Sequence, residues 1–147
     1  MKKLSRDNLT PAQRSYAMSQ VRSKDTSPEL AVRRALFRRG LRFRKHRRDL
    51  PGTPDIVFVT AKVAVFVDGE FWHGYQFARW RDKLSDYWRA RIERNIRRDR
   101  RAHRHLRRLG WVVVRVWQRE FERESAPIVN AIELVVRDRL KPRRKVG

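Results

Sequence analysis

The sequence predicts one α/β domain in which helices flank a central β-sheet. The chain has 147 residues, of which 40% are hydrophobic, and this is enough for one modest core. The spacing of apolar residues also changes along the chain between a helical and a strand period, in the order α-α-β-β-β-α-β-α. We expect residues 1–140 to form the domain and residues 141–147 to form a loosely ordered basic tail.

Two helices are expected at the start of the chain. Residues 10–13 have the pattern of a capping box with proline at the first helical position, which predicts a helix to about Arg22. The Ser-Pro-Glu sequence that starts at Ser27 repeats this signal, with Ser27 as the N-cap. The second helix is expected to end at Gly40.

Strand patterns follow the second helix. Apolar and basic residues alternate over residues 41–44, which predicts a strand. The short apolar runs at 56–59 and 63–67 are typical of central strands that are buried on both faces. The remaining elements are a long polar helix, a further strand and a last helix, expected at residues 85–109, at 111–117 and from Ser125 onward.

The charge balance indicates a polyanionic partner. The chain has 38 Lys and Arg against 16 Asp and Glu, a formal net charge of +22. DNA or RNA is the favoured partner because each neutralised phosphate releases counterions. An acidic membrane surface is a weaker alternative, and a highly soluble or ribosome-associated protein has a similar composition. There is no cysteine, so disulfides and thiolate metal sites are excluded and a reducing cytoplasm is permitted. No apolar run is long enough to span a bilayer, and the N-terminus does not resemble a signal peptide.

Acidic residues are the informative ones in so basic a chain. Asp55 follows a stiff Pro-Gly-Thr-Pro turn at the start of one apolar run, and Asp68 ends the next. A hairpin through residues 60–62 would place both carboxylates at the same end of neighbouring strands. Two carboxylates there form a hard oxygen site suited to Mg²⁺, in the outline of the PD-(D/E)xK nucleases. Alternatively, Asp55 caps a turn and Asp68 pairs with an arginine.

The segment after Asp68 adds further candidates. His73 could act as general acid or base, because imidazole gains and loses a proton near neutral pH. Phe71 and Trp72 lie in a polar, glycine-flanked segment where they could stack on DNA bases or wedge between them. They could equally cover the edge of the core.

These residues, with several other segments, resemble the Vsr (very short patch repair) DNA mismatch endonuclease family. The similar segments lie between about residues 10 and 120, at 14–18, 24–29, 51–55 and 68–74, and in the C-terminal half at 87–88, 95–99, 109–111 and 116–117. The family has a restriction-endonuclease-like fold, a three-layer domain with a mixed central sheet. Its members use magnesium to cut one DNA strand beside a T:G mismatch. The resemblance therefore implies duplex DNA as the substrate.

The resemblance also implies roles for individual residues. Asp55 would be the principal metal ligand, the main-chain carbonyl of Val67 another, and His73 the catalytic histidine. Glu29 would position water around the metal, although a carboxylate in the first turn of a helix is also stabilised by the helix dipole. Residues expected to push into the DNA stack are Phe71, Trp72 and Trp88, with Met18 approaching from the opposite groove unless it only packs in the core.

Two features depart from the family pattern. The best-known member has histidine at the place of Asp68, and we expect Asp68 to be a second metal ligand. The family's structural zinc site needs cysteines that this chain lacks, so no zinc is expected. We expect Glu70 and Arg119 to form an ion pair there, with Tyr75 and Phe77 filling the space, unless both charges face water.

Arginine is dense between residues 88 and 108, where Arg91 and Arg98 are candidate DNA contacts. A second basic patch is expected in the second helix, and any single arginine could also simply face solvent. We expect a monomer that uses Mg²⁺, with Mn²⁺ as a substitute, in the bacterial cytoplasm at the nucleoid.

Three functions fit these patterns. The first is a nickase for mismatched duplex DNA. The second is a related nuclease with another mismatch, a lesion or a defence-related DNA as its target. The third is a non-catalytic nucleic-acid-binding protein, which the joint presence of Glu29, Asp55, Asp68 and His73 disfavours.

Overall fold

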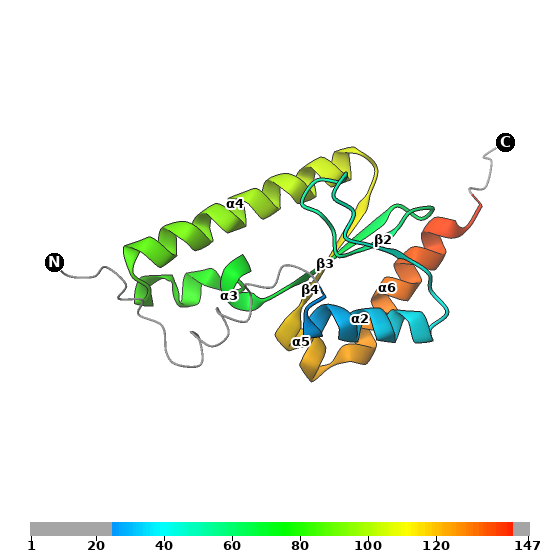
Figure 1. The fold of residues 1–147 in the computed structure, drawn as a ribbon, viewed down its shortest axis with the longest axis horizontal. Helices are drawn as coiled ribbons and strands as arrows, with labels where there is room; N and C mark the ends of the chain where they lie inside the picture. Colours follow the sequence, from blue (N-terminus) through cyan, green and yellow to red (C-terminus); the bar gives the residue numbers. More distant parts are fainter. Residues whose placement is uncertain (1–24, 143–147) are drawn as a thin grey trace.

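The computed structural model describes residues 25–142, and its centre is one mixed four-stranded sheet (Figure 1). The strand order is β1-β2-β3-β4. β1 and β2 are antiparallel, as are β2 and β3, whereas β3 and β4 are parallel. The strands comprise β1 (Arg44–Lys45), β2 (Ile56–Phe58), β3 (Val63–Asp68) and β4 (Val112–Trp117). Because β4 is joined to β3 in parallel, a long crossover must connect them, and a helix supplies most of it.

Helices cover both faces of the sheet, which confirms the three-layer α/β prediction. α2 (Ser27–Arg38) and α6 (Ser125–Leu140) lie on one face, and α4 (Asp86–Arg108) lies on the other (Figure 1). The short helix α5 (Gln118–Arg123) connects β4 to α6. The sheet is therefore buried between helical layers, as the apolar runs at 56–59 and 63–67 predicted.

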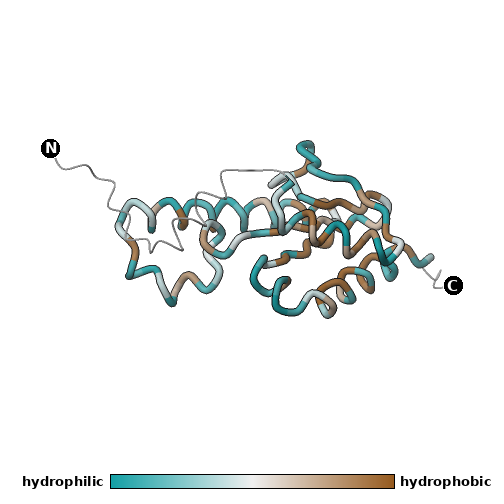
Figure 2. The backbone as a smooth tube through the Cα atoms, turned by 60° about the horizontal axis from the view of Figure 1, so that its bottom comes forward, coloured by the Kyte–Doolittle hydropathy of each residue, from teal (hydrophilic) through white to brown (hydrophobic). Residues whose placement is uncertain are grey.

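The alternation of side chains along β3 divides the core into two layers. Val63 and Val65 pack against α2 and α6, whereas Ala64 and Phe66 face α4. All four are at most 6% exposed, as expected for a strand with no solvent face. In Figure 2, hydrophobic colour gathers in the strands and α6, whereas α4 is mainly hydrophilic.

The first half of α4 extends beyond the sheet and has its own partners. These are the short helix α3 (Glu70–His73) and two 3₁₀ turns, η1 (Phe77–Arg79) and η2 (Arg81–Lys83). Gly74 permits the close approach of α3 to α4, because a Cβ there would lie 2.3 Å from the Cδ1 atom of Ile96. Its φ of 71° also favours glycine.

Some boundaries differ from those predicted. The N-cap of α2 is Thr26 and not Ser27, because the Thr26 side chain accepts the N–H of Glu29. The strand predicted at 41–44 contributes only Arg44 to β1. The reason is that the N–H of Leu41 donates to the carbonyl of Leu36 at the end of α2 and cannot join the sheet.

Other predictions were met or lie outside the described residues. The helix expected at 85–109, the strand at 111–117 and the helix from Ser125 are confirmed as α4, β4 and α6. α3 and α5 were not predicted. The helix expected at 10–22 and most of the tail at 141–147 lie outside the described residues. Within residues 25–142, no helix is both long and apolar enough to cross a membrane.

Candidate active site

A cavity of about 960 Å³ opens where the ends of β2 and β3 meet α2, α3 and α4. Most of the site residues predicted from the sequence line it, namely Glu29, Asp55, Val67, Asp68, Trp72, His73, Arg91 and Arg98. Asp99 and Asn95 of α4 also line it. The cavity is therefore the place where the separate motifs of the sequence meet.

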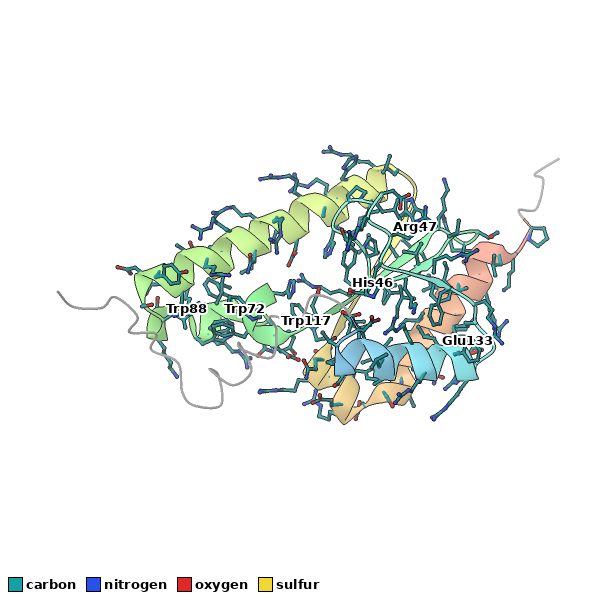
Figure 3. The ribbon with its side chains drawn as sticks, viewed as in Figure 1. His46, Arg47, Trp72, Trp88, Trp117 and Glu133 are labelled. Carbon is teal, nitrogen blue, oxygen red and sulfur yellow. The ribbon has the colours of Figure 1, made fainter. Side chains whose placement is uncertain are left out.

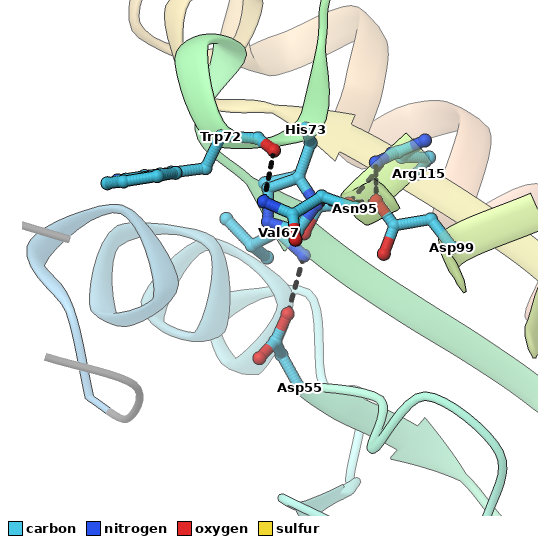
Figure 4. Close-up of polar contacts among 8 residues, drawn as sticks. Asp55, Val67, Trp72, His73, Asn95, Asp99 and Arg115 are labelled. Carbon is cyan, nitrogen blue, oxygen red and sulfur yellow. Dashed lines mark hydrogen bonds and ion pairs between the residues drawn. The ribbon is translucent and has the colours of Figure 1, made fainter. Parts of the chain in front are cut away.

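The β2–β3 hairpin brings Asp55 and Asp68 to the same end of the sheet, as predicted. Ile56 pairs with Val65 in antiparallel register, so Asp55 before β2 lies beside the end of β3. The N–H of Asp55 donates to the Val65 carbonyl at 3.0 Å. In return, its carboxylate accepts the N–H of Val67 at 2.7 Å (Figure 4). The carboxylate is thus held by main-chain atoms of the neighbouring strand.

Asp55 lies in a strongly acidic environment. Its pKa is raised to about 8, mainly by burial and also by the nearby carboxylates of Glu29 and Asp68, while the hydrogen bond from the Val67 N–H lowers it. Among the described residues, no arginine, lysine or histidine forms an ion pair with Asp55. A buried carboxylate without a cation is a place where a metal ion fits.

Glu29 stands beside Asp55 in the first turn of α2. It is 4% exposed, and burial raises its pKa. Its carboxylate accepts the N–H of Asp25 at 3.1 Å and lies 3.6 Å from Nε2 of His46. Asp25, Glu29 and His46 can each offer a ligand atom within 4.8 Å of the others, so this group could hold a metal ion. Asp25 already pairs with Arg33 at 2.7 Å.

The opposite wall of the cavity is an ion-pair network centred on Arg115 of β4. Its Nε atom donates to Asp68 at 2.7 Å, and its Nη2 atom donates to Asp99 at 2.8 Å. Nδ1 of His73 lies 2.6 Å from the same oxygen of Asp99, and its Nε2 lies 3.4 Å from Asp68 (Figure 4). Two carboxylates therefore share one guanidinium and one imidazole.

This network orients His73. With Nδ1 of the imidazole bonded to Asp99, Nε2 is the nitrogen on the side of Asp68, at 3.4 Å, where both residues line the cavity. Burial alone would raise the pKa of Asp99, but the His73 hydrogen bond and the charges of His73 and Arg115 lower it overall. Asp99 is therefore an ionised partner that fixes the imidazole.

Asp99 and Arg115 are candidate site residues that sequence reasoning missed. A signal existed for each, because Asp99 is an acid inside an arginine-rich helix and Arg115 interrupts an apolar strand. The alternative that Asp68 pairs with an arginine is what the structure shows.

Aromatic side chains form the rim of the cavity at the free end of α4. Trp72 and Trp88 lie 5.5 Å apart between ring centroids, and the guanidinium of Arg91 lies 5.0 Å above Trp72 (Figure 3). Asn95 donates to the carbonyl of Trp72 at 3.0 Å and so ties α3 to α4. Phe71 was predicted to contact DNA, but it is 6% exposed and forms the centre of this cluster. Met18 lies outside the described residues.

Polar contacts connect the residues at the positions where the family pattern has its zinc ligands. The predicted Glu70–Arg119 ion pair is not formed. The Glu70 carboxylate instead accepts a hydrogen bond from the main-chain N–H of Arg119, and the Arg119 side chain is exposed to solvent. Tyr75, which was expected to fill space, donates its hydroxyl to Glu120 at 2.7 Å. The contacts connect α3 and the segment after it to α5.

Comparisons with known proteins agree with this arrangement. A family model described as DNA mismatch endonuclease Vsr matches residues 6–79. The chain is 46% identical to the Type II nicking enzyme V.XorIIP of Xanthomonas oryzae pv. oryzae over 138 residues, 92% of this chain and 98% of the relative. It is 41% identical over 136 residues to the Type II nicking enzyme V.NmeDIP of Neisseria meningitidis serogroup C, 90% of this chain and 92% of the relative. It is also 34% identical over 109 residues to the DNA mismatch endonuclease Vsr of Escherichia coli, 73% of this chain and 70% of the relative.

Proposed function

Because the chain belongs to the Vsr family of DNA mismatch endonucleases and is a DNA endonuclease, we propose that it nicks one strand of duplex DNA at a T:G-like mismatch with Mg²⁺ as cofactor. The observation that carries the proposal is Asp55, a half-buried carboxylate beside Glu29 and Asp68 with no cationic partner among the described residues. A non-catalytic function, which the sequence left open, does not fit membership of this family.

Asp55 and the main-chain carbonyl of Val67 are the proposed metal ligands, with Glu29 positioning water beside them. Magnesium bound there would polarise a phosphodiester and lower the pKa of an attacking water. Asp68 is proposed as a further ligand through Oδ1, because its Oδ2 is bonded to Arg115. If Asp68→Asn cuts as well as the parent at limiting Mg²⁺, this last role is wrong.

His73 is the proposed general acid or base. Its imidazole is fixed by Asp99, which accepts a hydrogen bond from Nδ1. Nε2 is then the nitrogen that would give a proton to, or take one from, the groups at the scissile phosphate. The side chain is 23% exposed, so it is open to the cavity. Asp99 acts through His73, and we class it as a positioning residue.

The aromatic rim supports a distorted duplex as substrate. Trp72 is half-buried and lines the cavity, and the half-buried Trp88 packs beside it, with Arg91 over both rings. Exposed ring faces can stack on bases. A mismatched pair costs less to unstack than a matched one, so wedging residues favour it. Phe71 supports these rings from below, and Arg98 lines the cavity where a phosphate would pass.

A second target class is favoured by the names of the relatives. Several are called Type II nicking enzymes, so a nicking role that serves a defence system, or acts at another mismatch or lesion, is the alternative. In either case we propose a monomer that works on DNA in the cytoplasm and accepts Mn²⁺ in place of Mg²⁺.

The test uses end-labelled duplexes that differ in one base pair. The purified protein is incubated with a T:G duplex, the matched duplex and a panel of other mismatches, each with Mg²⁺, Mn²⁺ or EDTA. We expect a nick in one strand of the T:G duplex with either metal and none with EDTA. Faster cutting of another mismatch would replace the T:G target, and cutting in EDTA would contradict the metal site.

A further inference from the structure

A second, smaller cavity lies on the other flank of α4. It has a volume of about 460 Å³ and is lined by Arg100, His103, Arg104, Arg107, Val113 and Arg115. We call it the α4–β4 groove. Nothing in the proposed cleavage reaction uses this groove, although Arg115 of its lining also bonds Asp68 and Asp99 of the larger cavity.

The two cavities lie on opposite flanks of one helix. We call the larger cavity of the candidate active site the cleavage cavity. Its lining from α4 includes Arg91, Asn95 and Arg98, which follow a three-to-four residue spacing and share one flank. Arg100, Arg104 and Arg107 follow the same spacing but start two residues later than Arg98. Two residues are about 200° of helix rotation. DNA in the cleavage cavity therefore leaves the groove side of α4 free.

The groove carries positive charge without an internal counterion. Its lining contains no carboxylate, and within residues 25–142 the side chains of Arg100, Arg104 and Arg107 form no ion pair. Like charges that converge in this way repel one another unless an anion neutralises them. The structure thus supplies the donors for an anion and no acceptor of its own.

The floor of the groove is a buried side chain that is packed against the core. His103 is 7% exposed and packs on Phe66 at 4.6 Å between ring centroids. Burial lowers the pKa of His103, and the charge of Arg115 lowers it further, so the neutral imidazole adds no charge. β4 is the last strand of the sheet, so the groove runs along an open strand edge.

We propose that the α4–β4 groove binds backbone phosphates of duplex DNA outside the cleavage cavity. The three arginines from Arg100 to Arg107 span seven residues, or about 10 Å of helix. One DNA strand carries a phosphate about every 3.4 Å of axis, so the row matches about three phosphates. Guanidinium groups suit this ligand because each can bind two phosphate oxygens at once. The inference rests on the DNA-directed activity of the family and not on the mismatch.

The experiment compares two double charge reversals on the same helix. Arg104→Glu with Arg107→Glu alters the groove. The control is Arg97→Glu with Arg101→Glu, which changes the net charge equally at exposed positions that line neither cavity. Binding to a long labelled duplex is measured without metal over a range of salt concentrations, together with the thermal stability of each variant.

In the groove variant, the slope of log K against log salt should become less negative by about two units. The reason is that two phosphate contacts are lost and each contributes about 0.9 to the magnitude of the slope. The control should lose less than half as much. Equal losses in the two variants, or no loss in the groove variant, would overturn the proposal. If the reversal impairs folding, Arg104→Gln with Arg107→Gln should still lower the slope relative to Arg97→Gln with Arg101→Gln. Because binding is measured without cutting, failure of the mismatch proposal would not affect this result.

Discussion

The two walls of the cleavage cavity differ in how their charges are balanced. On one wall, Asp68 and Asp99 share the guanidinium of Arg115 and contact His73. On the other, Asp55 has a main-chain donor and no cationic partner among the described residues. The carboxylates of the first wall already have cationic partners in the protein, whereas the carboxylate of the second is stabilised only when a proton or a cation neutralises it.

This difference also appears in the direction of the pKa shifts. The pKa of Asp55 is raised by burial, while that of Asp99 is lowered because His73 and Arg115 outweigh burial. A raised pKa favours the protonated form and a lowered pKa the ionised form. We infer that the Asp99 wall is preorganised and that the Asp55 wall supplies the principal metal ligand, so it is called the metal wall below.

The largest expected effect comes from Asp55→Asn, which removes the charge that a metal would bind. We expect nicking to fall at least about a thousandfold, because a metal contributes several kcal/mol to the reaction and each 1.4 kcal/mol is tenfold in rate. Rates are measured under single-turnover conditions at saturating protein. DNA binding without metal should not weaken. A variant that cuts normally would contradict the assignment of the metal wall.

Asp99→Asn should have the next largest effect, because it replaces the carboxylate that fixes the His73 imidazole with a neutral amide, whose NH₂ group can face Nδ1 instead. We expect nicking to fall on the order of a hundredfold, as for loss of general acid–base catalysis, and its pH profile to change. Glu124→Gln, an exposed acid outside both cavities, is the control. An Asp99→Asn variant with the parent's pH profile would show that Asp99 has only a structural role.

Arg115→Met tests whether the preorganised wall depends on its own cation. The substitution leaves Asp68 and Asp99 without their shared partner, and we expect a loss of about 2–3 kcal/mol in the free energy of unfolding. The loss is below that of a fully buried pair because the Arg115 side chain is 23% exposed. Adding Asp68→Asn should recover part of it. A double variant less stable than Arg115→Met would contradict the pairing.

The elements that determine the sheet were predictable, whereas the partner of Asp68 was not. The apolar runs at 56–59 and 63–67 and the turn between them are local signals, and they placed Asp55 and Asp68 at the same sheet end. Arg115 lies 47 residues after Asp68 and reaches it only because β3 and β4 pair in parallel. The sequence contains no local pattern for such a register.

The contacts between α3 and α5 and the position of Phe71 show a similar limit of prediction from the sequence. The absence of cysteine excluded a thiolate site. Composition cannot specify the contacts found there, in which the carboxylates of Glu120 and Glu70 accept from the Tyr75 hydroxyl and from the main-chain N–H of Arg119. The aromatic segment left core packing and DNA contact open for Phe71, and burial favours the core. Short helices such as α3 and α5 were missed because they have too few turns to show a period.

The two walls should respond oppositely to pH. Between its ordinary value of 3.8 and about 8, folded Asp55 retains a proton that the unfolded chain releases, so stability without metal should fall as pH rises. Asp99 has the opposite sign, because its stabilisation is present above 3.8 and is lost as pH falls through its lowered pKa.

Metal binding should reverse the effect at Asp55, because the ion displaces the proton. Its affinity should rise about tenfold per pH unit below about pH 8. Calorimetric titration with Mg²⁺ or Mn²⁺ at several pH values measures this, with Asp55→Asn as the control. Metal affinity that does not change with pH in the parent would place the ion elsewhere.

Thr26→Ala should give the smallest effect and tests how the Asp55 wall is held in place. The Thr26 side chain caps α2 by accepting the N–H of Glu29, the residue that lies beside Asp55. Loss of an N-cap costs about 1 kcal/mol, so we expect a small decrease in the free energy of unfolding. Ser27→Ala is the control, since Ser27 was predicted to be the cap but lies inside the helix. Because the first turn of α2 also positions Glu29, the Thr26 variant should need more Mg²⁺ for half-maximal nicking, while Ser27→Ala should not. Equal changes in both variants would mean that helix stability, and not the position of Glu29, controls the metal wall.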